Sequence, residues 1–176
     1  MKIVARENKI NGIFRLDKLT LKRKNSDKLF EREQFIIPNS VGILVHSVKN
    51  NKIVLVRQFR IGPEMELEEI VAGKLEEKDE SKESAASREV LEETGFQVES
   101  IELIHEFYTC PGPVTEKMNL YYAQVSNQVE AGGGLETENE EITIIQRNVS
   151  DFLSYTFIDA KTIIAQQWLK LHFPKE

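Results

Sequence analysis

Three carboxylates with helical spacing are the part of the sequence best suited to chemistry. Glu89, Glu92 and Glu93 stand at relative positions i, i+3 and i+4, which places them on one face of a helix. Carboxylates crowded in this way suit Mg²⁺ or Mn²⁺, which bind a few hard oxygen ligands, keep several waters and take further oxygens from a phosphate. The spacing therefore predicts a site for Mg²⁺, with Mn²⁺ as an alternative. By itself it is also compatible with an acidic, solvated helix face.

The neighbouring residues favour a helix from Lys82 to Thr94. This segment lacks Gly and Pro, and Ser81 and Glu83 near its start are typical of helix N-termini. Gly95 is suited to end the helix. We therefore expect a helix that carries all three carboxylates and is preceded by a loop that begins at Gly73.

The same stretch resembles the Nudix box. That pattern is Gly, five residues, Glu, seven residues, then Arg-Glu-apolar-any-Glu-Glu-any-Gly-apolar. Glu80, the seven residues after it and the run from Arg88 to Phe96 fit the pattern, but six residues separate Gly73 from Glu80 where the pattern has five. Because every helix position keeps its spacing, we interpret the extra residue as an insertion in the loop before the helix.

Length and composition limit the other possibilities. A chain of 176 residues fits one domain with an additional hairpin. A net charge of −6 disfavours a nucleic-acid or anionic-membrane partner. The single cysteine, Cys110, excludes an internal disulfide and suggests a reducing compartment. No apolar run is long enough to span a bilayer and the N-terminus lacks a signal-peptide core, so we expect a cytoplasmic protein without membrane contacts.

Short apolar runs separated by turns predict strands on both sides of the box. Residues 2–37 are expected to form strands with a hairpin turn at Asn11-Gly12. Such a layer is too small to stand alone, so it must pack on the main domain or on another subunit. Further strands are expected at residues 41–48, 52–60, 69–72, 98–107, 118–125 and 142–146, with a loop at 61–68 and helices at 149–155 and 159–173.

Two segments beside the box carry candidate binding groups. Arg57 and Arg60 lie at the end of the predicted strand 52–60; they are either solvated arginines at a strand edge or guanidinium groups that bind a diphosphate, ribose or base. The loop at residues 131–141 contains three glycines, which would allow it to move, and four glutamates. It is either a disordered acidic surface loop or a source of catalytic acids. The backbone carbonyl of Ala72, just before Gly73, is a further oxygen for a metal ion.

Outside the box, the chain looks like the ADP-ribose and nucleoside-diphosphate-sugar pyrophosphatase branch of the Nudix hydrolases. The features that carry this resemblance are VRQFR at residues 56–60, EIVAGK at 69–74, Pro111, PGPVTEK at 111–117, GGGLE at 132–136 and DAKT at 159–162. The resemblance implies an α+β fold, an α/β/α sandwich with a mixed β-sheet between helices. It also implies an N-terminal β-hairpin layer at residues 1–38 that mediates homodimerisation, and a Nudix hydrolase domain at residues 39–176.

The resemblance also implies a role for individual residues. Glu89 and Glu93 would bind Mg²⁺ with Glu92 assisting, the Ala72 carbonyl would complete the protein ligands, and Arg88 would orient a box carboxylate. Within the acidic loop, Glu138 would activate water and Glu140 would be a further metal ligand, although Glu136 or Glu140 could be the base instead. The implied substrate-binding residues are Arg57, Arg60, Glu69, Pro111 and Thr115.

The implied reaction is hydrolysis of the diphosphate of a nucleotide sugar or ADP-ribose to a nucleoside monophosphate and a sugar phosphate. Bound cations would neutralise the diphosphate and lower the pKa of a coordinated water, and a carboxylate would accept its proton. Two alternatives are a housecleaning Nudix hydrolase of nucleoside triphosphates and a nucleotide-sugar-binding module without catalysis.

Overall fold

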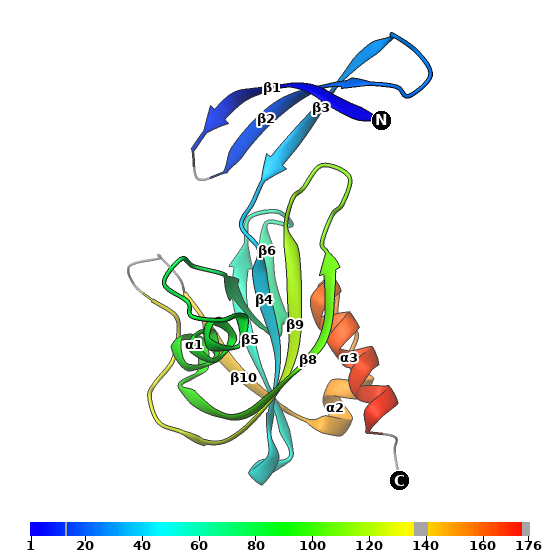
Figure 1. The fold of residues 1–176 in the computed structure, drawn as a ribbon. Coiled ribbons are helices and arrows are strands. Elements are labelled where there is room, and N and C mark those ends of the chain that lie inside the picture. The colour runs from blue at the N-terminus through cyan, green and yellow to red at the C-terminus, as the bar shows by residue number, and fades with distance from the viewer. Residues whose placement is uncertain (13, 136–140, 174–176) are drawn as a thin grey trace. The chain divides into compact units, whose positions relative to one another are not determined.

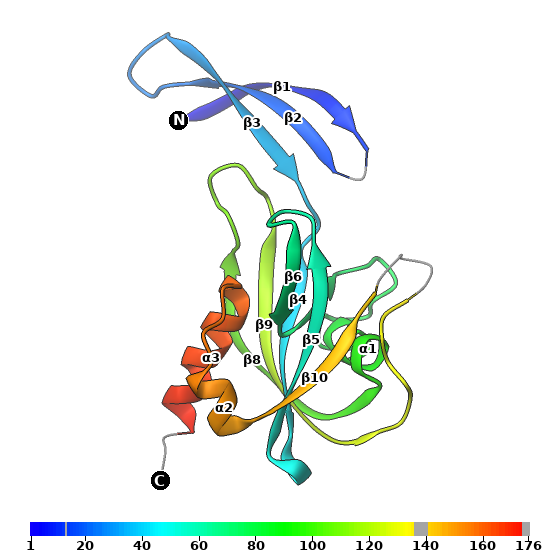
Figure 2. The same ribbon diagram turned by 180° about the vertical axis from the view of Figure 1, so that it is seen from behind.

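The structure is a computed structural model that describes residues 1–12, 14–135 and 141–173. The chain forms two compact units, which we describe separately. The first contains residues 1–40 and 106–118, and the second contains residues 41–105 and 119–176. Figures 1 and 2 show the course of the chain from opposite sides.

The first unit is built on a three-stranded antiparallel sheet in the order β1-β2-β3. Its strands are β1 (Lys2–Asn11), β2 (Arg15–Lys22) and β3 (Leu29–Ile36). The register pairs Asn11 with Arg15 across the expected hairpin turn. The loop that precedes Lys117 joins this unit, because the Phe35 amide donates to the Pro113 carbonyl at 2.7 Å and the Thr115 amide donates to the Phe35 carbonyl at 3.1 Å.

The second unit contains a seven-stranded sheet between helices. The sheet order is β10-β5-β4-β9-β8, with β6 paired to β5 and β7 paired to β4. The strands are β4 (Ser40–Ser47), β5 (Lys52–Arg60), β6 (Met65–Glu69), β7 (Val71–Lys74), β8 (Phe96–Tyr108), β9 (Lys117–Gln128) and β10 (Thr143–Asn148), and the 3-10 turn η1 spans Val48–Asn50. Antiparallel pairs join β5 to β4, β6 and β10, whereas β4 and β9 run in the same direction in Figure 1. The sheet is therefore mixed, as expected.

The helices are α1 (Lys82–Thr94), α2 (Val149–Ser154) and α3 (Ala160–His172). On one face of the sheet, apolar side chains of β4 and β5 form a hydrophobic core with α1; its members include Val41, Ile43, Val45, Val54, Val56, Ala85, Ala86 and Val90. On the other face, the ring of Tyr122 from β9 lies 5.2 Å from that of Trp168 in α3. Because successive strand residues point to opposite faces, α1 and α3 cover different faces of the sheet (Figures 1 and 2).

One expected loop is wrong. Residues 61–68 do not form a single loop, since β6 begins at Met65 and pairs with β5 from Val56 to Arg60. The acidic sequence of β6, MELEE, has weak strand propensity. Pairing with β5 satisfies its backbone groups and overrides that preference. Within the described residues, no helix has the length and apolar character needed to cross a bilayer.

Candidate active site

Helix α1 has the bounds that the sequence predicts, and local contacts explain both ends. The Ser81 hydroxyl accepts a hydrogen bond from the Ser84 amide, and the Ser84 hydroxyl accepts one from the Ser81 amide. This reciprocal cap satisfies amide groups that would otherwise lack a partner in the first turn. Gly95 ends the helix with φ 71°, a conformation that strongly favours glycine. The apolar side of α1 packs on the sheet, which fixes the direction of its carboxylate face.

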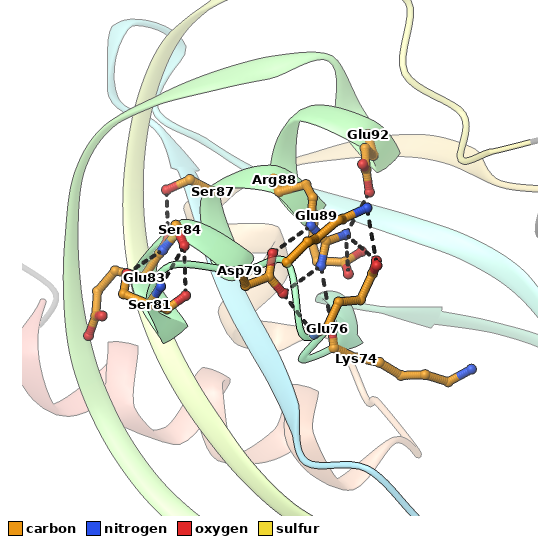
Figure 3. A network of polar contacts seen from close by, with 11 residues as sticks. Lys74, Glu76, Asp79, Ser81, Glu83, Ser84, Ser87, Arg88, Glu89 and Glu92 are labelled. Atoms are coloured by element: carbon orange, nitrogen blue, oxygen red, sulfur yellow. Dashed lines mark hydrogen bonds and ion pairs between the residues drawn. The ribbon is translucent and has the colours of Figure 1, made fainter.

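Arg88 connects the carboxylates of this face to the preceding loop (Figure 3). Its Nη1 donates to Glu89 Oε1 and to Glu92 Oε2, both at 2.9 Å. Its Nη2 donates to the Lys74 carbonyl at 3.2 Å. The hydrogen bond to Asp79 is the largest of the causes that raise the pKa of Arg88. Arg88 therefore forms ion pairs with two box carboxylates.

Two acids of the preceding loop contact Arg88: Asp79 through hydrogen bonds, and Glu76, whose Oε1 lies 3.4 Å from Arg88 Nη1. Arg88 Nε donates to Asp79 Oδ1 at 3.0 Å and Nη2 to Asp79 Oδ2 at 3.2 Å, while Glu80 is exposed. Five residues separate Gly73 from Asp79, so the regular box spacing holds up to this carboxylate. Counting five residues forward from Gly73 reaches Asp79, whereas the spacing read back from Arg88 reaches Glu80. The match of Glu80 to the box stays a prediction.

The Glu89 carboxylate occupies the space beside Gly73. A Cβ atom at this position would lie 1.9 Å from Glu89 Cδ and 2.0 Å from Glu89 Oε1. The Glu89 carboxylate therefore lies against the backbone of β7, next in sequence to Ala72. A side chain at residue 73 would displace this carboxylate.

The glycines at residues 132–134 close the C-terminal end of α1. The Gly133 amide donates to the Glu93 carbonyl at 2.9 Å and the Gly134 amide to the Glu92 carbonyl at 3.2 Å. A Cβ on Gly132, which has φ 69°, would lie 2.5 Å from the Thr94 carbonyl carbon. These glycines allow a close backbone approach that satisfies carbonyl groups at the helix end. The freedom to move that we expected of the loop stays a prediction.

The side chain of Arg60, the last residue of β5, contacts the side chain of Glu69, the last residue of β6. Arg60 Nε donates to Glu69 Oε1 at 2.5 Å, and the second carboxylate oxygen of Glu69 accepts from Lys161 of α3. Burial lowers the pKa of Arg60, but the hydrogen bond to Glu69 and the charges of Glu69, Glu93 and Asp159 raise it overall. The charge of Glu93 therefore acts on Arg60, which places Arg60 near the carboxylate side of α1. The sequence analysis did not identify Lys161, although DAKT contains it.

Arg57 lies on the opposite face of β5 from Arg60, because an odd number of positions separates them along a regular strand. Its Nη2 donates to Glu68 Oε1 at 2.6 Å. Arg147 of β10 donates to the other Glu68 oxygen, with Nη2 at 2.5 Å, and its guanidinium lies 4.0 Å from the centre of the Tyr155 ring. The two arginines that we expected as binding groups thus belong to different clusters.

The remaining predicted residues are distributed between the other unit and the acidic loop. Pro111 and Thr115 belong to the first unit, where Thr115 Oγ1 accepts from the Ile37 amide at 2.9 Å and donates to the Ile37 carbonyl at 3.0 Å. Glu138 and Glu140 lie outside the described residues. The roles expected for these four residues stay predictions.

The donor groups on α1 fit a hard cation. Glu89 and Glu92 supply carboxylate oxygens held by Arg88, and Glu93 supplies a carboxylate that is only 2% exposed. A buried carboxylate is costly unless a positive charge lies nearby, and oxygen donors are the ligands that Mg²⁺ and Mn²⁺ prefer. In the described part of the chain, no three His, Cys, Asp or Glu side chains are close enough to hold an ion together. Residues outside that part or the substrate would complete the set.

Comparisons with known proteins identify the family. The NUDIX domain family matches residues 37–164, which is most of the chain and includes the whole carboxylate face. The chain belongs to the Nudix hydrolase family. Its sequence is 33% identical to a GDP-mannose pyrophosphatase of Cronobacter sakazakii, in an alignment that covers 86% of this chain and 84% of the relative. It is 37% identical to a methanol dehydrogenase activator of Bacillus methanolicus, in an alignment that covers 80% of this chain and 77% of the relative.

A solved structure has the same fold. The crystal structure of an ADP compounds hydrolase superimposes with a TM-score of 0.79, covering 99% of this chain and 96% of that chain at 21% identity. Together with the family match, it confirms the α+β Nudix fold with a mixed sheet between helices.

Proposed function

We propose that the chain is a Mg²⁺-dependent pyrophosphohydrolase that cleaves the diphosphate of a nucleoside diphosphate sugar or ADP-ribose to a nucleoside monophosphate and a sugar phosphate. The observation that carries this proposal is that carboxylates and a guanidinium group occur at one site. The carboxylate face of α1 is organised by Arg88, and the Arg60 guanidinium lies within the influence of Glu93. Carboxylates suit a cation and a guanidinium suits a phosphate, so the site can take a metal–diphosphate complex. The similarity to GDP-mannose pyrophosphatases supports the substrate class.

The residues of the site have complementary roles in this proposal. Glu89 and Glu93 hold Mg²⁺ or Mn²⁺ with Glu92 assisting, and the Ala72 carbonyl and Glu140 complete the ligands. The bound cation neutralises phosphate charge and lowers the pKa of water. Arg88 donates hydrogen bonds to both Glu89 and Glu92 and so holds their carboxylates close together. Glu138 accepts the proton of the attacking water.

The test is product identification with the purified protein and Mg²⁺ or Mn²⁺. The panel contains GDP-mannose, UDP-glucose, ADP-glucose, ADP-ribose and nucleoside triphosphates. We expect a nucleoside monophosphate and a sugar phosphate from at least one diphosphate substrate. Release of pyrophosphate from a triphosphate as the dominant reaction would replace this proposal with triphosphate housecleaning. Absence of any product with either cation would favour a binding module.

The acidic loop provides a test of the base. Glu138→Gln should lower kcat by about 10²- to 10⁴-fold while KM changes little, since general base catalysis contributes on that scale. Glu136→Gln is the matched control in the same loop. A comparable loss in Glu136→Gln or Glu140→Gln, with normal turnover in Glu138→Gln, would assign the base to the other residue.

The methanol dehydrogenase activator suggests a second candidate, in which the chain stimulates another enzyme. The two functions separate in an assay that adds this chain to a methanol dehydrogenase. Stimulation by wild type and by Glu93→Gln alike would indicate action through binding. Stimulation by wild type alone would indicate that hydrolysis is required.

We also propose that residues 1–38 mediate a homodimer. Every residue of β1 is exposed in the single chain, and the large apolar side chains Ile3, Val4 and Ile10 are 48%, 46% and 56% exposed. An exposed edge strand with apolar side chains favours pairing with another chain. Light scattering should give twice the mass calculated from the sequence, and charged substitutions at Ile3 and Ile10 should shift it to the monomer mass. A monomeric wild type would contradict the proposal.

A further inference from the structure

Glu69 is a buried carboxylate whose two oxygens are both occupied by cationic side chains. It is 1% exposed. One oxygen accepts from Arg60 Nε at 2.5 Å, and the other accepts from Lys161, whose sequence position is 92 residues away. Both carboxylate oxygens of Glu69 therefore already have a cationic partner, and the expected direct contact of Glu69 with a substrate stays a prediction. Glu69 can also act through the groups that it binds.

Arg60 uses only one of its three nitrogens in this contact. Among the described residues, Nε bonds to Glu69, and neither terminal nitrogen donates a hydrogen bond. The side chain is 36% exposed. Nη1 and Nη2 form the planar fork that suits phosphate oxygens. A carboxylate on Nε fixes the plane of this fork without blocking it.

Lys161 is held in place by the start of α3. Asp159 caps the helix by accepting from the Thr162 amide at 3.0 Å, and Thr162 Oγ1 accepts from the Ile70 amide at 2.9 Å, directly after Glu69. Lys161 Nζ also lies 3.2 Å from Asp159 Oδ1. This hydrogen bond thus holds the start of α3 next to the end of β6, which carries Glu69. Lys161, only 12% exposed, approaches Glu69 from a fixed position.

We propose that Lys161 and Glu69 are positioning residues that orient the Arg60 guanidinium toward the substrate diphosphate. The inference rests on the proposed function, since it names the group that Arg60 meets. Replacing a buried ion pair by apolar groups often leaves stability unchanged or improved, so stability alone does not explain why Arg60, Glu69 and Lys161 are charged. Holding the Arg60 guanidinium in a fixed plane does explain these charges. Binding energy depends on groups that are already oriented before the substrate arrives.

The first experiment observes Arg60 without any substrate. Proton–nitrogen NMR of arginine side chains resolves protected Nε–H groups, and Arg60→Lys identifies the resonance. In Lys161→Met and Glu69→Gln, we expect this resonance to shift and broaden as Arg60 gains freedom. Lys170→Met, on the exposed part of the same helix, is the control and should leave it unchanged. An unaltered Arg60 resonance in Lys161→Met would overturn the proposal.

The second experiment is a double-mutant cycle on the diphosphate substrate that the product panel identifies. Lys161→Met should lower kcat/KM about tenfold, mainly by raising KM. In an Arg60→Ala background the same substitution should change kcat/KM less than about twofold, because the group it positions is gone. A tenfold loss that persists in that background would show that Lys161 does not act through Arg60.

The two experiments separate the inference from the function on which it rests. A wild type that hydrolyses nothing in the panel would refute the proposed function, while the NMR comparison would still decide whether Lys161 and Glu69 orient Arg60. If Lys161→Met fails to fold by circular dichroism, Lys161→Gln, which also removes the charge, replaces it in both experiments with the same expected outcomes.

Discussion

Two ion-pair networks flank the carboxylate face of α1, and they are built in opposite ways. In one, Arg88 is a single cation among the acids Glu76, Asp79, Glu89 and Glu92. In the other, Glu69 is a single buried acid between Arg60 and Lys161. The Arg88 network joins residues within one loop and one helix, whereas the Glu69 network joins two strands and a distant helix. The first holds groups suited to a cation, and the second holds a group suited to an anion.

Glu93 lies on the same helix as Glu89 and Glu92, and among changes to the groups around these two networks its removal should have the largest effect. It follows Glu92 on α1, and its charge acts on Arg60. Glu93→Gln should lower kcat by about 10²- to 10³-fold at saturating Mg²⁺, because a metal ligand contributes several kcal/mol to the reaction. Turnover is measured by product release. Full activity would remove Glu93 from the metal site.

The position of Glu89 provides a geometric test of the Arg88 network. Gly73→Ala places a Cβ 1.9 Å from Glu89 Cδ, so the carboxylate must move. We expect a loss of kcat of about 10- to 100-fold, the scale associated with a displaced catalytic group. Gly62→Ala is the control, since nothing lies within 4 Å of its Cβ. Equal activities of the two variants would show that the contact between Glu89 and Gly73 has no functional role.

Substitutions of the adjacent loop acids Asp79 and Glu80 test which of the two supports the Arg88 network. Asp79→Asn should lower kcat by about tenfold, within the range for groups that support metal ligands. Glu80→Gln should have no effect, because Glu80 is exposed. Steady-state kinetics of both variants provides the measurement. A loss confined to Glu80→Gln would restore the alignment that the sequence alone favoured.

The smallest expected effect concerns pH. The hydrogen bond from Arg88, with one from the Glu76 amide, lowers the pKa of Asp79 below its usual 3.8. A carboxylate with a lowered pKa in the folded state stabilises the protein above its unfolded pKa and loses that contribution as pH falls through the folded pKa. The difference in Tm between wild type and Asp79→Asn should therefore be largest above about pH 4 and shrink in more acidic solution. A difference that grows on acidification would contradict this sign.

Much of the Arg88 network could be predicted from the sequence because its members are near in the chain. Helical spacings of four and three residues bring Glu92 next to Arg88 and next to Glu89. The bounds of α1 follow from Ser81 and Gly95, whose capping is also local. The contact between Asp79 and Arg88 could not be predicted in the same way. Asp79 lies in a loop, where no regular period relates the spacing of residues to the direction of their side chains.

The sequence by itself determined the family, helix α1, its carboxylate face and the presence of arginines at the end of β5. Only the tertiary structure decided that Arg57 pairs with Glu68 while Arg60 pairs with Glu69, and that the glycines at residues 132–134 close the end of α1. It also decided that Lys161 reaches Glu69. The physical reason is distance along the chain: side-chain reach and backbone periodicity fix contacts within a few turns, whereas contacts between distant segments depend on how the sheet and helices pack.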